Sequence, residues 1–379
     1  MKRKVNLSLK EIVLVTGGAG FIGSHLVDAL VGNGYKVRVL DNLAPPTHDG
    51  KLPEWFNKKA EYIKGDVRNK KDWERCLKRV DYVFHLAAYM DYHMDFSTFF
   101  KSNTESTALL YEVILEKKIR VKKIIVTSSQ SVYGEGKYKC SSHGMFYPES
   151  RSEEQLKSHK WEVICPKDGK IVKVVPQKEI DEPRPCIPYG ISKLAAEKLA
   201  ITLGKIYKIP SVALRYSIVH GSRQSIFHFY SGALREFSVL ALSGQPIRMH
   251  EDGNQTRDFV NVHDLVEAHL VVLKDKRADY EIFNIGSGRT TKVYDLAKLV
   301  CHKANVKFEP ILESIYRLRT ARNQPMDISK LGKLGWKPTR SLDNNVEEYL
   351  AWVKKYPQAI KYLKKTESEL RKTKVINRS

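Results

Sequence analysis

The sequence has no long hydrophobic run and little cysteine. None of its uninterrupted apolar stretches reaches the roughly 18 residues that a membrane-spanning helix needs. The N-terminal segment, MKRKVNLSLK, is basic and lacks the apolar core of a secretory signal peptide. An odd number of cysteines argues against a disulfide framework and favours a reducing compartment, so we expect a cytoplasmic protein. The five cysteines among the 379 residues are Cys76, Cys140, Cys165, Cys186 and Cys301.

Acidic residues are also in deficit. The chain has 43 Asp and Glu against 65 Lys and Arg, which gives a formal net charge of +22. Such an excess can attract nucleic acid or an anionic membrane. The lysines, however, are spread along the chain in pairs such as Lys58-Lys59 and Lys122-Lys123, and no basic block is interleaved with aromatic residues. We therefore expect neither nucleic acid nor membrane as a partner, and a positive field of this kind suits a small anionic substrate.

What the sequence does contain is a strand, a glycine turn and a helix close to its start. Residues 12–15 are apolar and mostly β-branched, Gly17, Gly20 and Gly23 follow, and a helical pattern of apolar residues comes next. Glycine permits the tight turn and lets a ligand approach the backbone, while the helix start offers unpaired N–H groups to a phosphate. This context predicts a dinucleotide-binding turn. The alternative is a glycine turn with a purely structural role.

The residue after the next predicted strand indicates which dinucleotide. The strand at 36–40 ends in Asp41, roughly 20 residues past the glycines, where a carboxylate suits the ribose hydroxyls of NAD. NADP would favour a cation at this point. Arg38 is inside the strand and Asn42 is neutral, so the sequence predicts NAD.

Strands and helices keep alternating after this unit. Repeated βα units predict an α/β fold with a doubly wound, mostly parallel Rossmann sheet, followed by a smaller mixed α/β domain. We expect the sheet domain over 1–215, with an irregular polar insertion over 135–186, and a substrate-binding domain over 216–379. Further strands are predicted at 60–64, 82–86, 123–126 and 212–216, and helices at 72–78, 102–116, 189–203, 264–273, 294–302 and 345–355.

Three residues carry the pattern of acid–base chemistry. Tyr189 and Lys193 are four apart on a predicted helix and share one face, and Ser129 ends a predicted strand. A free tyrosine has a pKa of about 10, too high for a base at neutral pH, and we expect the Lys193 ammonium to lower that of Tyr189. Ser129 could then hydrogen-bond the same substrate oxygen. The alternative for Tyr189 and Lys193 is a surface pair without function.

With these motifs in place, the chain resembles the extended short-chain dehydrogenase/reductases, in particular the NAD-dependent nucleotide-sugar epimerase/dehydratase family. The resemblance covers nearly the whole chain and rests on TGGAGFIGSHL, DNL, GDV, HLAA, TSSQSVYG, YGISK, RDFVNVHDL and FNIG. It implies that Ser129 and Tyr189 are the catalytic pair and that Lys193 tunes the tyrosine. It also implies that Ser129 and Gln130 contact the sugar, and that Arg257 and Arg322 hold the nucleotide diphosphate. For Arg257 the alternative is an ion pair with a neighbour such as Asp258.

The resemblance further implies a set of residues that contact NAD. They come from the glycine turn, from the ends of the following strands and from the helix that carries the catalytic tyrosine. They are Gly17, Gly20, Phe21, Ile22, Gly23, Asp41, Asn42, Asp66, Val67, Leu86, Ala87, Ala88, Asn103, Tyr189, Lys193 and Tyr216.

Two departures from the family pattern bear on the reaction and the sugar. Family dehydratases carry an Asp-Glu pair where this chain has Gln130-Ser131, so the resemblance implies 4-epimerisation through a transient 4-keto sugar. A 4,6-dehydratase or another NAD-dependent oxidoreductase is the alternative, and a non-catalytic NAD-binding or RNA-binding protein is the alternative of a different class. Ile218 replaces an asparagine that usually meets the nucleotide-sugar. The segment around it resembles the dTDP-L-rhamnose 4-epimerase-like branch more than UDP-glucose 4-epimerases, so we expect a dTDP- or UDP-linked sugar. The family also implies a homodimer.

The insertion contains two short motifs with metal-ligand spacing. Cys140 and His143 are separated by two residues, and so are Cys165 and Asp168, as in a zinc ribbon. Relatives with a similar insertion tend to have a fuller cysteine set. We therefore expect a flap without metal that descends from such a ribbon, and bound zinc is the alternative.

Overall fold

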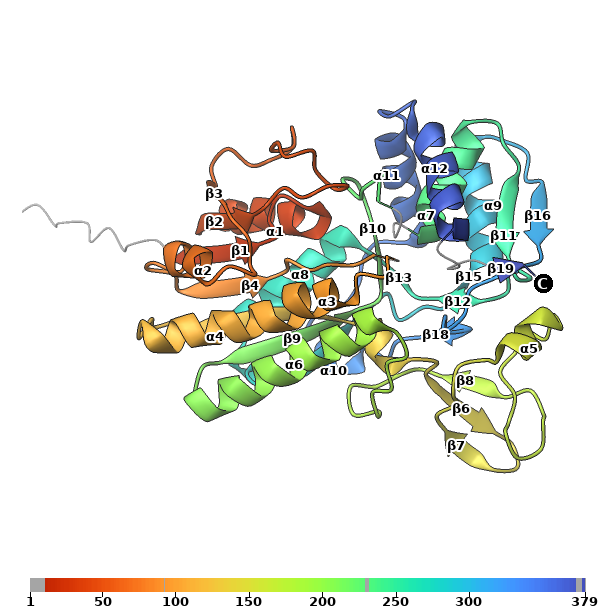
Figure 1. Ribbon diagram of the computed structural model, residues 1–379, viewed down its shortest axis with the longest axis horizontal. Helices are drawn as coiled ribbons and strands as arrows, with labels where there is room; N and C mark the ends of the chain where they lie inside the picture. The colour runs from red at the N-terminus through yellow and green to blue at the C-terminus, as the bar shows by residue number, and fades with distance from the viewer. Residues whose placement is uncertain (1–10, 92, 229–231, 373–376, 379) are drawn as a thin grey trace, which may run out of the picture.

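The structure is a computed structural model that describes residues 11–91, 93–228, 232–372 and 377–378 (Figure 1). The basic N-terminal segment, from which the absence of a signal peptide was predicted, lies outside these residues. Within the described ranges, no helix is both long enough and apolar enough to cross a membrane.

A parallel sheet of seven strands forms the centre of the molecule. Its order is β3-β2-β1-β4-β5-β9-β14, so the chain starts near the middle, moves to one edge and then returns to build the other half. Each strand pairs in parallel with its neighbours, for example Val13 of β1 with Val37 of β2 and Tyr82 of β4. This confirms the predicted α/β Rossmann fold. The strands are β1 Ile12–Thr16, β2 Lys36–Asp41, β3 Glu61–Lys64, β4 Tyr82–His85, β5 Lys123–Ser129, β9 Ser211–Tyr216 and β14 Ile282–Ile285.

Helices cover both faces of this sheet. On one face, α1 (Phe21–Gly32) and α8 (Val262–Lys274) bury a cluster with the strands that includes Leu26, Leu30 and Leu265. The helices of the other face bury a second cluster that includes Trp73 and Leu110. They are α2 Lys70–Cys76, α3 Phe96–Phe99, α4 Ser106–Glu116 and α6 Pro188–Tyr207, with a π-helical segment, Phe100–Glu105, leading into α4. Parallel strands that are buried on both faces need a continuous run of apolar residues, and such runs made the strands of this sheet predictable from the sequence.

The second lobe has a core of its own. Helices α7 (Gly232–Leu242), α9 (Val293–Ala304) and α11 (Leu342–Val353) pack together around Leu234, Leu296 and Tyr349. The short strands of this lobe form small sheets that are separate from the large one. The remaining elements of the lobe are β10 Ile218–His220, β11 Ile247–His250, β12 Thr256–Arg257, β13 Phe259–Asn261, β15 Thr291–Lys292, β16 Pro310–Glu313, β17 Ile315–Tyr316, β18 Asn323–Gln324, α10 Ser329–Gly332, α12 Ala359–Lys372 and β19 Asn377–Arg378.

The two lobes are not divided at residue 215 as expected. Strand β14 pairs with β9 at the edge of the large sheet, and α8 packs on α1, although both come from the part of the chain assigned to the second domain. The reason is that β9 has both an open edge and an apolar face. The chain returns from the second lobe to supply β14, which pairs the edge, and α8, which covers the face.

The insertion is more regular than its sequence suggested. Strands β6 (Lys137–Cys140), β7 (Gly144–Phe146) and β8 (Lys173–Val175) form an antiparallel sheet, and α5 (Glu153–Lys157) lies beside it. This unit projects from the sheet domain below the second lobe (Figure 1). Two ion pairs join it to that lobe, a buried one between Arg151 and Glu251 at 2.9 Å and one between the buried Arg322 and the partly exposed Glu162 at 2.6 Å.

Candidate active site

The glycine turn between β1 and α1 is packed so closely that a side chain at Gly17 or Gly23 would collide with the backbone. Gly17 has φ +69°, and a Cβ there would lie 2.9 Å from the backbone nitrogen of Ala87. A Cβ on Gly23 would lie 2.1 Å from the Gly17 carbonyl oxygen. Gly20 is the N-cap of α1 and makes no side-chain cap, so the first N–H groups of the helix remain available to an anion. The turn therefore fits a dinucleotide pyrophosphate.

The carboxylates beside this turn fit an unphosphorylated ribose. Asp41 ends β2, where one carboxylate oxygen accepts from Ala19 N at 3.0 Å and the other from Leu43 N at 2.9 Å. Asn42 donates to Asp66 at 3.1 Å. The Arg38 side chain points elsewhere, since it pairs with Glu61 at 2.8 Å. With carboxylates here and Arg38 engaged elsewhere, this corner suits the ribose of NAD rather than the 2′-phosphate of NADP.

Tyr189, Lys193 and Ser129 meet at the carboxyl edge of the sheet. Helix α6 starts with Pro188 at its first turn, which places Tyr189 at the edge and Lys193 one turn further on. The Ser129 hydroxyl, at the end of β5, hydrogen-bonds the Tyr189 side chain. The Lys193 ammonium donates to Thr127 Oγ1 at 2.8 Å. This arrangement can exchange a proton with a hydroxyl group of a ligand, with Ser129 as a second hydrogen-bond partner.

The pKa of the tyrosine differs from the sequence expectation. Burial raises the pKa of Tyr189 to about 12, against the opposing hydrogen bond from Ser129. Burial also lowers the pKa of Lys193 to about 7, although Glu197 opposes this. Lys193 alone therefore does not lower the pKa of Tyr189, contrary to the expectation from the sequence. A desolvated pair of this kind needs an added positive charge to favour the phenolate.

One cavity of about 980 Å³ joins all these groups to the second lobe. All residues expected to contact NAD line it except Asn103, and Ser129, Gln130 and Arg257 line it as well. Two of its polar atoms, Ser128 Oγ and Gln130 Oε1, are buried without a hydrogen-bond partner among the described residues. Buried polar atoms are rarely left unpaired, so these two indicate a place for a polar ligand.

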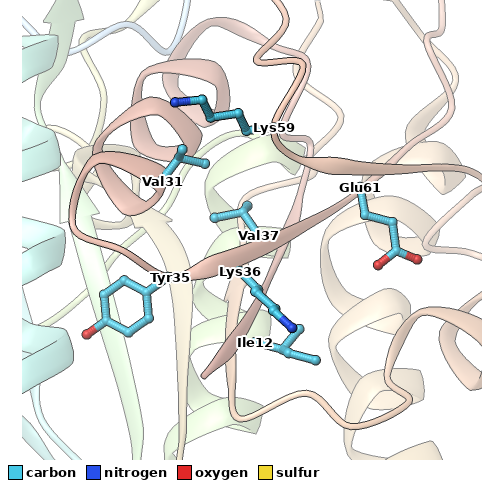
Figure 2. A pocket seen from close by; sticks show the side chains of 7 residues that line it. All are labelled: Ile12, Val31, Tyr35, Lys36, Val37, Lys59 and Glu61. Atoms are coloured by element: carbon cyan, nitrogen blue, oxygen red, sulfur yellow. The ribbon is translucent and has the colours of Figure 1, made fainter. Parts of the chain in front are cut away.

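A second hollow, of about 490 Å³, lies at the opposite edge of the sheet. Figure 2 shows that its charged side chains do not converge, because the ends of Lys59 and Glu61 point in different directions. Tyr35 also borders it, with its ring turned away from both. We therefore assign the site to the larger cavity.

Two expected contact residues are placed elsewhere. Asn103 is buried and holds the backbone of Tyr89 through hydrogen bonds of 2.8 and 3.0 Å, so it shapes the cavity wall rather than lining it. Arg322 is fully buried outside the cavity. Its guanidinium is held by ion pairs with Glu162 at 2.6 Å, Glu251 at 2.9 Å and Asp252 at 2.8 Å. A guanidinium surrounded by three carboxylates has no free donor for a diphosphate, which corrects the expectation for Arg322.

Arg257 has the opposite environment. It lines the cavity, and within the described part of the chain its guanidinium donates only to the carbonyl oxygens of Thr256 and Arg322. Burial lowers the pKa of Arg257 to about 10. Asp258 does not pair with it but accepts from Ser287 N at 2.6 Å. A desolvated guanidinium without an ionic partner is suited to bind an anionic ligand.

Three residues that support Tyr189 and Lys193 were not predicted from the sequence. Arg215 and Glu197 form a fully buried bidentate ion pair at 2.9 and 2.6 Å, and Thr127 holds Lys193. For Glu197 and Thr127, their spacing in the sequence from residues already identified could have revealed them. Glu197 lies one helical turn beyond Lys193, and Thr127 is two residues before Ser129, so each shares a face with a residue already identified.

Comparisons with known proteins agree with this geometry. The model of the NAD dependent epimerase/dehydratase family matches residues 13–153 and 164–286. Among curated proteins, the chain is 33% identical over 359 residues to a dTDP-L-rhamnose 4-epimerase of Burkholderia thailandensis, covering 92% of this chain and 97% of that one.

Among solved structures, the chain is similar to nucleotide-sugar 4-epimerases as well. A UDP-glucose 4-epimerase of Thermotoga maritima with UDP-glucose has a TM-score of 0.75 and 32% identity, over 91% of this chain and 99% of that one. A UDP-glucuronic acid 4-epimerase of Bacillus cereus, in complex with UDP-glucuronic acid and NAD, has a TM-score of 0.73 and 28% identity, with the same coverage.

Proposed function

Since the chain belongs to the NAD-dependent epimerase/dehydratase family and uses NAD, we propose that it inverts C4 of a nucleotide-activated sugar through a transient 4-keto sugar. The observation that carries this proposal is the meeting of Ser129, Tyr189 and Lys193 in a cavity that also contains the glycine turn and Arg257. A non-catalytic NAD-binding protein would not need this complete set.

Each residue has a defined role in the proposal. Tyr189 takes the proton from the C4 hydroxyl group and later returns it, and Ser129 hydrogen-bonds the same oxygen. Lys193, held by Thr127, supplies a positive charge near the phenolate, and the phenolate in turn favours the protonated amine that burial disfavours. When bound, NAD would accept the C4 hydride and return it to the opposite face of the 4-keto sugar, so that it ends in its starting redox state, and its ring would add a positive charge beside the phenolate. The glycine turn and Asp41 hold it at the sheet edge.

The chemistry beside Ser129 favours epimerisation over dehydration. Loss of water from the sugar requires an acid, whereas the next residue is Gln130, an amide that cannot give up a proton. The Gln130 Oε1 atom is buried and without a partner among the described residues, so it can accept a hydrogen bond from a sugar hydroxyl.

For the sugar we propose a dTDP-linked 6-deoxyhexose ahead of a UDP-linked hexose. The curated relative described above is named a dTDP-L-rhamnose 4-epimerase, while the solved neighbours hold UDP-sugars. Ile218 lines the cavity and offers an apolar surface where the family has an amide. The deciding experiment is incubation of the purified protein with dTDP-, UDP-, GDP- and CDP-sugars, followed by NMR of the C4 configuration. Loss of water or a lasting change in cofactor redox state would overturn the epimerase assignment.

The Arg257→Gln variant is expected to raise KM for the nucleotide-sugar by about 10–100-fold, about 1.4–2.8 kcal/mol, with a smaller effect on kcat. The reason is the loss of a desolvated cation that meets the diphosphate in ground state and transition state alike. Steady-state kinetics measure it, and Arg289→Gln, at an exposed position outside the cavity, is the control. An unchanged KM would remove Arg257 from the diphosphate site.

The Lys193→Met variant is expected to move the acid limb of the kcat/KM profile to higher pH by about one unit or more. The active form of Tyr189 is the phenolate, so activity rises as pH passes its pKa. Removal of a neighbouring ammonium raises that pKa, and the limb shifts upward. Ser129→Ala should instead lower kcat at every pH. A Lys193→Met profile that keeps the wild-type midpoint would contradict the role of Lys193.

We also propose a homodimer through α4 and α6. The two helices lie side by side on the outside of the molecule (Figure 1). They expose Leu115, Ile191 and Ile206 with relative accessibilities of 36%, 44% and 61%. Light scattering that gives the mass of a single chain would contradict this proposal.

A further inference from the structure

We propose that the insertion over residues 135–186 holds a structural Zn²⁺ ion, bound by Cys140, His143, Cys165 and Asp168. These residues come from two loops, 22 residues or more apart in the sequence. The structure nevertheless places one ligand atom of each within 4.8 Å of all the others. The sequence had favoured a flap without metal, because relatives with a similar insertion tend to have a fuller cysteine set and the fourth candidate ligand here is an aspartate.

Four of the six distances between the ligand atoms match the edges of one tetrahedron. Metal–sulfur bonds of about 2.3 Å and metal–nitrogen or metal–oxygen bonds of about 2.0–2.2 Å give edges of roughly 3.3–3.8 Å. His143 Nδ1 is 3.5 Å from Cys140 Sγ and 3.4 Å from Cys165 Sγ. Asp168 Oδ2 is 3.8 Å from Cys140 Sγ and 3.6 Å from His143 Nδ1. All four donor atoms lie within 4.8 Å of one another, so small shifts of their side chains bring them around one small ion.

The two loops that carry these ligands have the same construction. Each follows the pattern cysteine, two residues, second ligand, glycine. The glycines, Gly144 and Gly169, have φ +78° and +69°, a conformation that reverses the chain just after the ligand. In the second loop Gly169 N donates to Cys165 O at 2.9 Å, and the backbone N–H groups of Lys167 and Asp168 point to the Cys165 sulfur. The backbone of the second loop thus fixes the Cys165 sulfur before any ion is bound.

The donor set selects the metal. Two thiolates and an imidazole favour a borderline-soft ion over Mg²⁺ or Ca²⁺, and a tetrahedral arrangement favours Zn²⁺. All four positions are supplied by the protein, as in structural sites, and no member of the cluster lines the large cavity. Neither Cys140 nor Cys165 is in a disulfide. The site is therefore structural and takes no part in the reaction proposed above.

The insertion has a reason to need such an ion. Its buried hydrophobic cluster consists of five residues, Tyr138, Cys140, Val163, Cys165 and Val172, which is little for a segment of this length. Yet the segment carries Arg151 and Glu162, whose ion pairs with Glu251 and Arg322 fasten it to the second lobe. An ion that closes the two loops would stabilise this unit and, through it, the position of the second lobe beside the cavity.

The test is the metal content of the purified full-length protein, produced under reducing conditions with zinc in the medium. Elemental analysis should find about one zinc per chain. Cys140→Ser and Cys165→Ser should each lower it at least tenfold. The matched control is Cys186→Ser, a cysteine of the same insertion that lies outside the cluster.

Cobalt substitution keeps the proposal testable if the cysteine variants do not fold. Co²⁺ added to the metal-free wild-type protein should give thiolate-to-cobalt charge transfer and the visible bands of a tetrahedral site. Asp168→Asn and His143→Gln should change these bands. Less than 0.1 zinc per chain together with no cobalt spectrum would overturn the proposal, and so would zinc that survives both cysteine variants or a Cys140–Cys165 disulfide in the reduced preparation.

Discussion

The Tyr189→Phe variant should lose about 10³-fold in kcat while it keeps its NAD. The change removes one oxygen atom, the group that takes up and returns the C4 proton in our proposal. General base catalysis by a positioned side chain contributes typically 10²–10⁴-fold, so the expected loss corresponds to about 4 kcal/mol of transition-state free energy. The phenylalanine ring fits the same space beside Ser129, and the glycine turn is untouched.

Two measurements separate this outcome from general damage. The NAD released on denaturation should equal that of the wild type, and NMR of the sugar product should show no inversion at the same enzyme concentration. Tyr35→Phe, in the hollow at the opposite edge of the sheet, is the matched control and should keep wild-type turnover. If Tyr189→Phe retains a tenth or more of the wild-type kcat, another group is the base.

The Glu197→Ala variant should lower the free energy of unfolding by about 3–5 kcal/mol, because it leaves a buried guanidinium without its partner. The side chains of Arg215 and Glu197 are 2% and 1% exposed. Arg215 also donates to the Tyr133 hydroxyl group at 2.8 Å, so the pair links α6, β9 and the segment after β5. Urea unfolding measures the loss.

The control for this prediction is an ion pair that water can reach. Glu116 binds Lys70 at 2.6 Å on the surface, with side-chain exposures of 51% and 38%, and Glu116→Ala should produce little change. Replacing both Arg215 and Glu197 by apolar residues should recover much of the loss, since no charge is then left unpaired. A Glu197→Ala protein as stable as the wild type would show that water or another group compensates Arg215.

Much of the first lobe was predictable because its signals are local. A buried parallel strand needs an apolar run and the glycine turn needs glycine, so β1, α1 and Asp41 could be located from sequence alone. The same holds for Tyr189 and Lys193, since a helix brings residues four apart onto one face. Family resemblance added the roles of these residues, and it extended the expectations to Asn103 and Arg322.

Only the tertiary structure revealed the features that depend on contacts between residues distant in the sequence. The sequence by itself predicted the Rossmann sheet, the NAD-binding turn and the grouping of Ser129, Tyr189 and Lys193. It could not reveal that Arg322 is enclosed by three carboxylates, that β14 returns to the large sheet, or that Cys140 and Cys165 face each other across two loops. Ion pairs, burial and metal-ligand geometry depend on contacts between side chains that are 22 to 187 positions apart in the sequence. A short sequence pattern cannot predict such contacts.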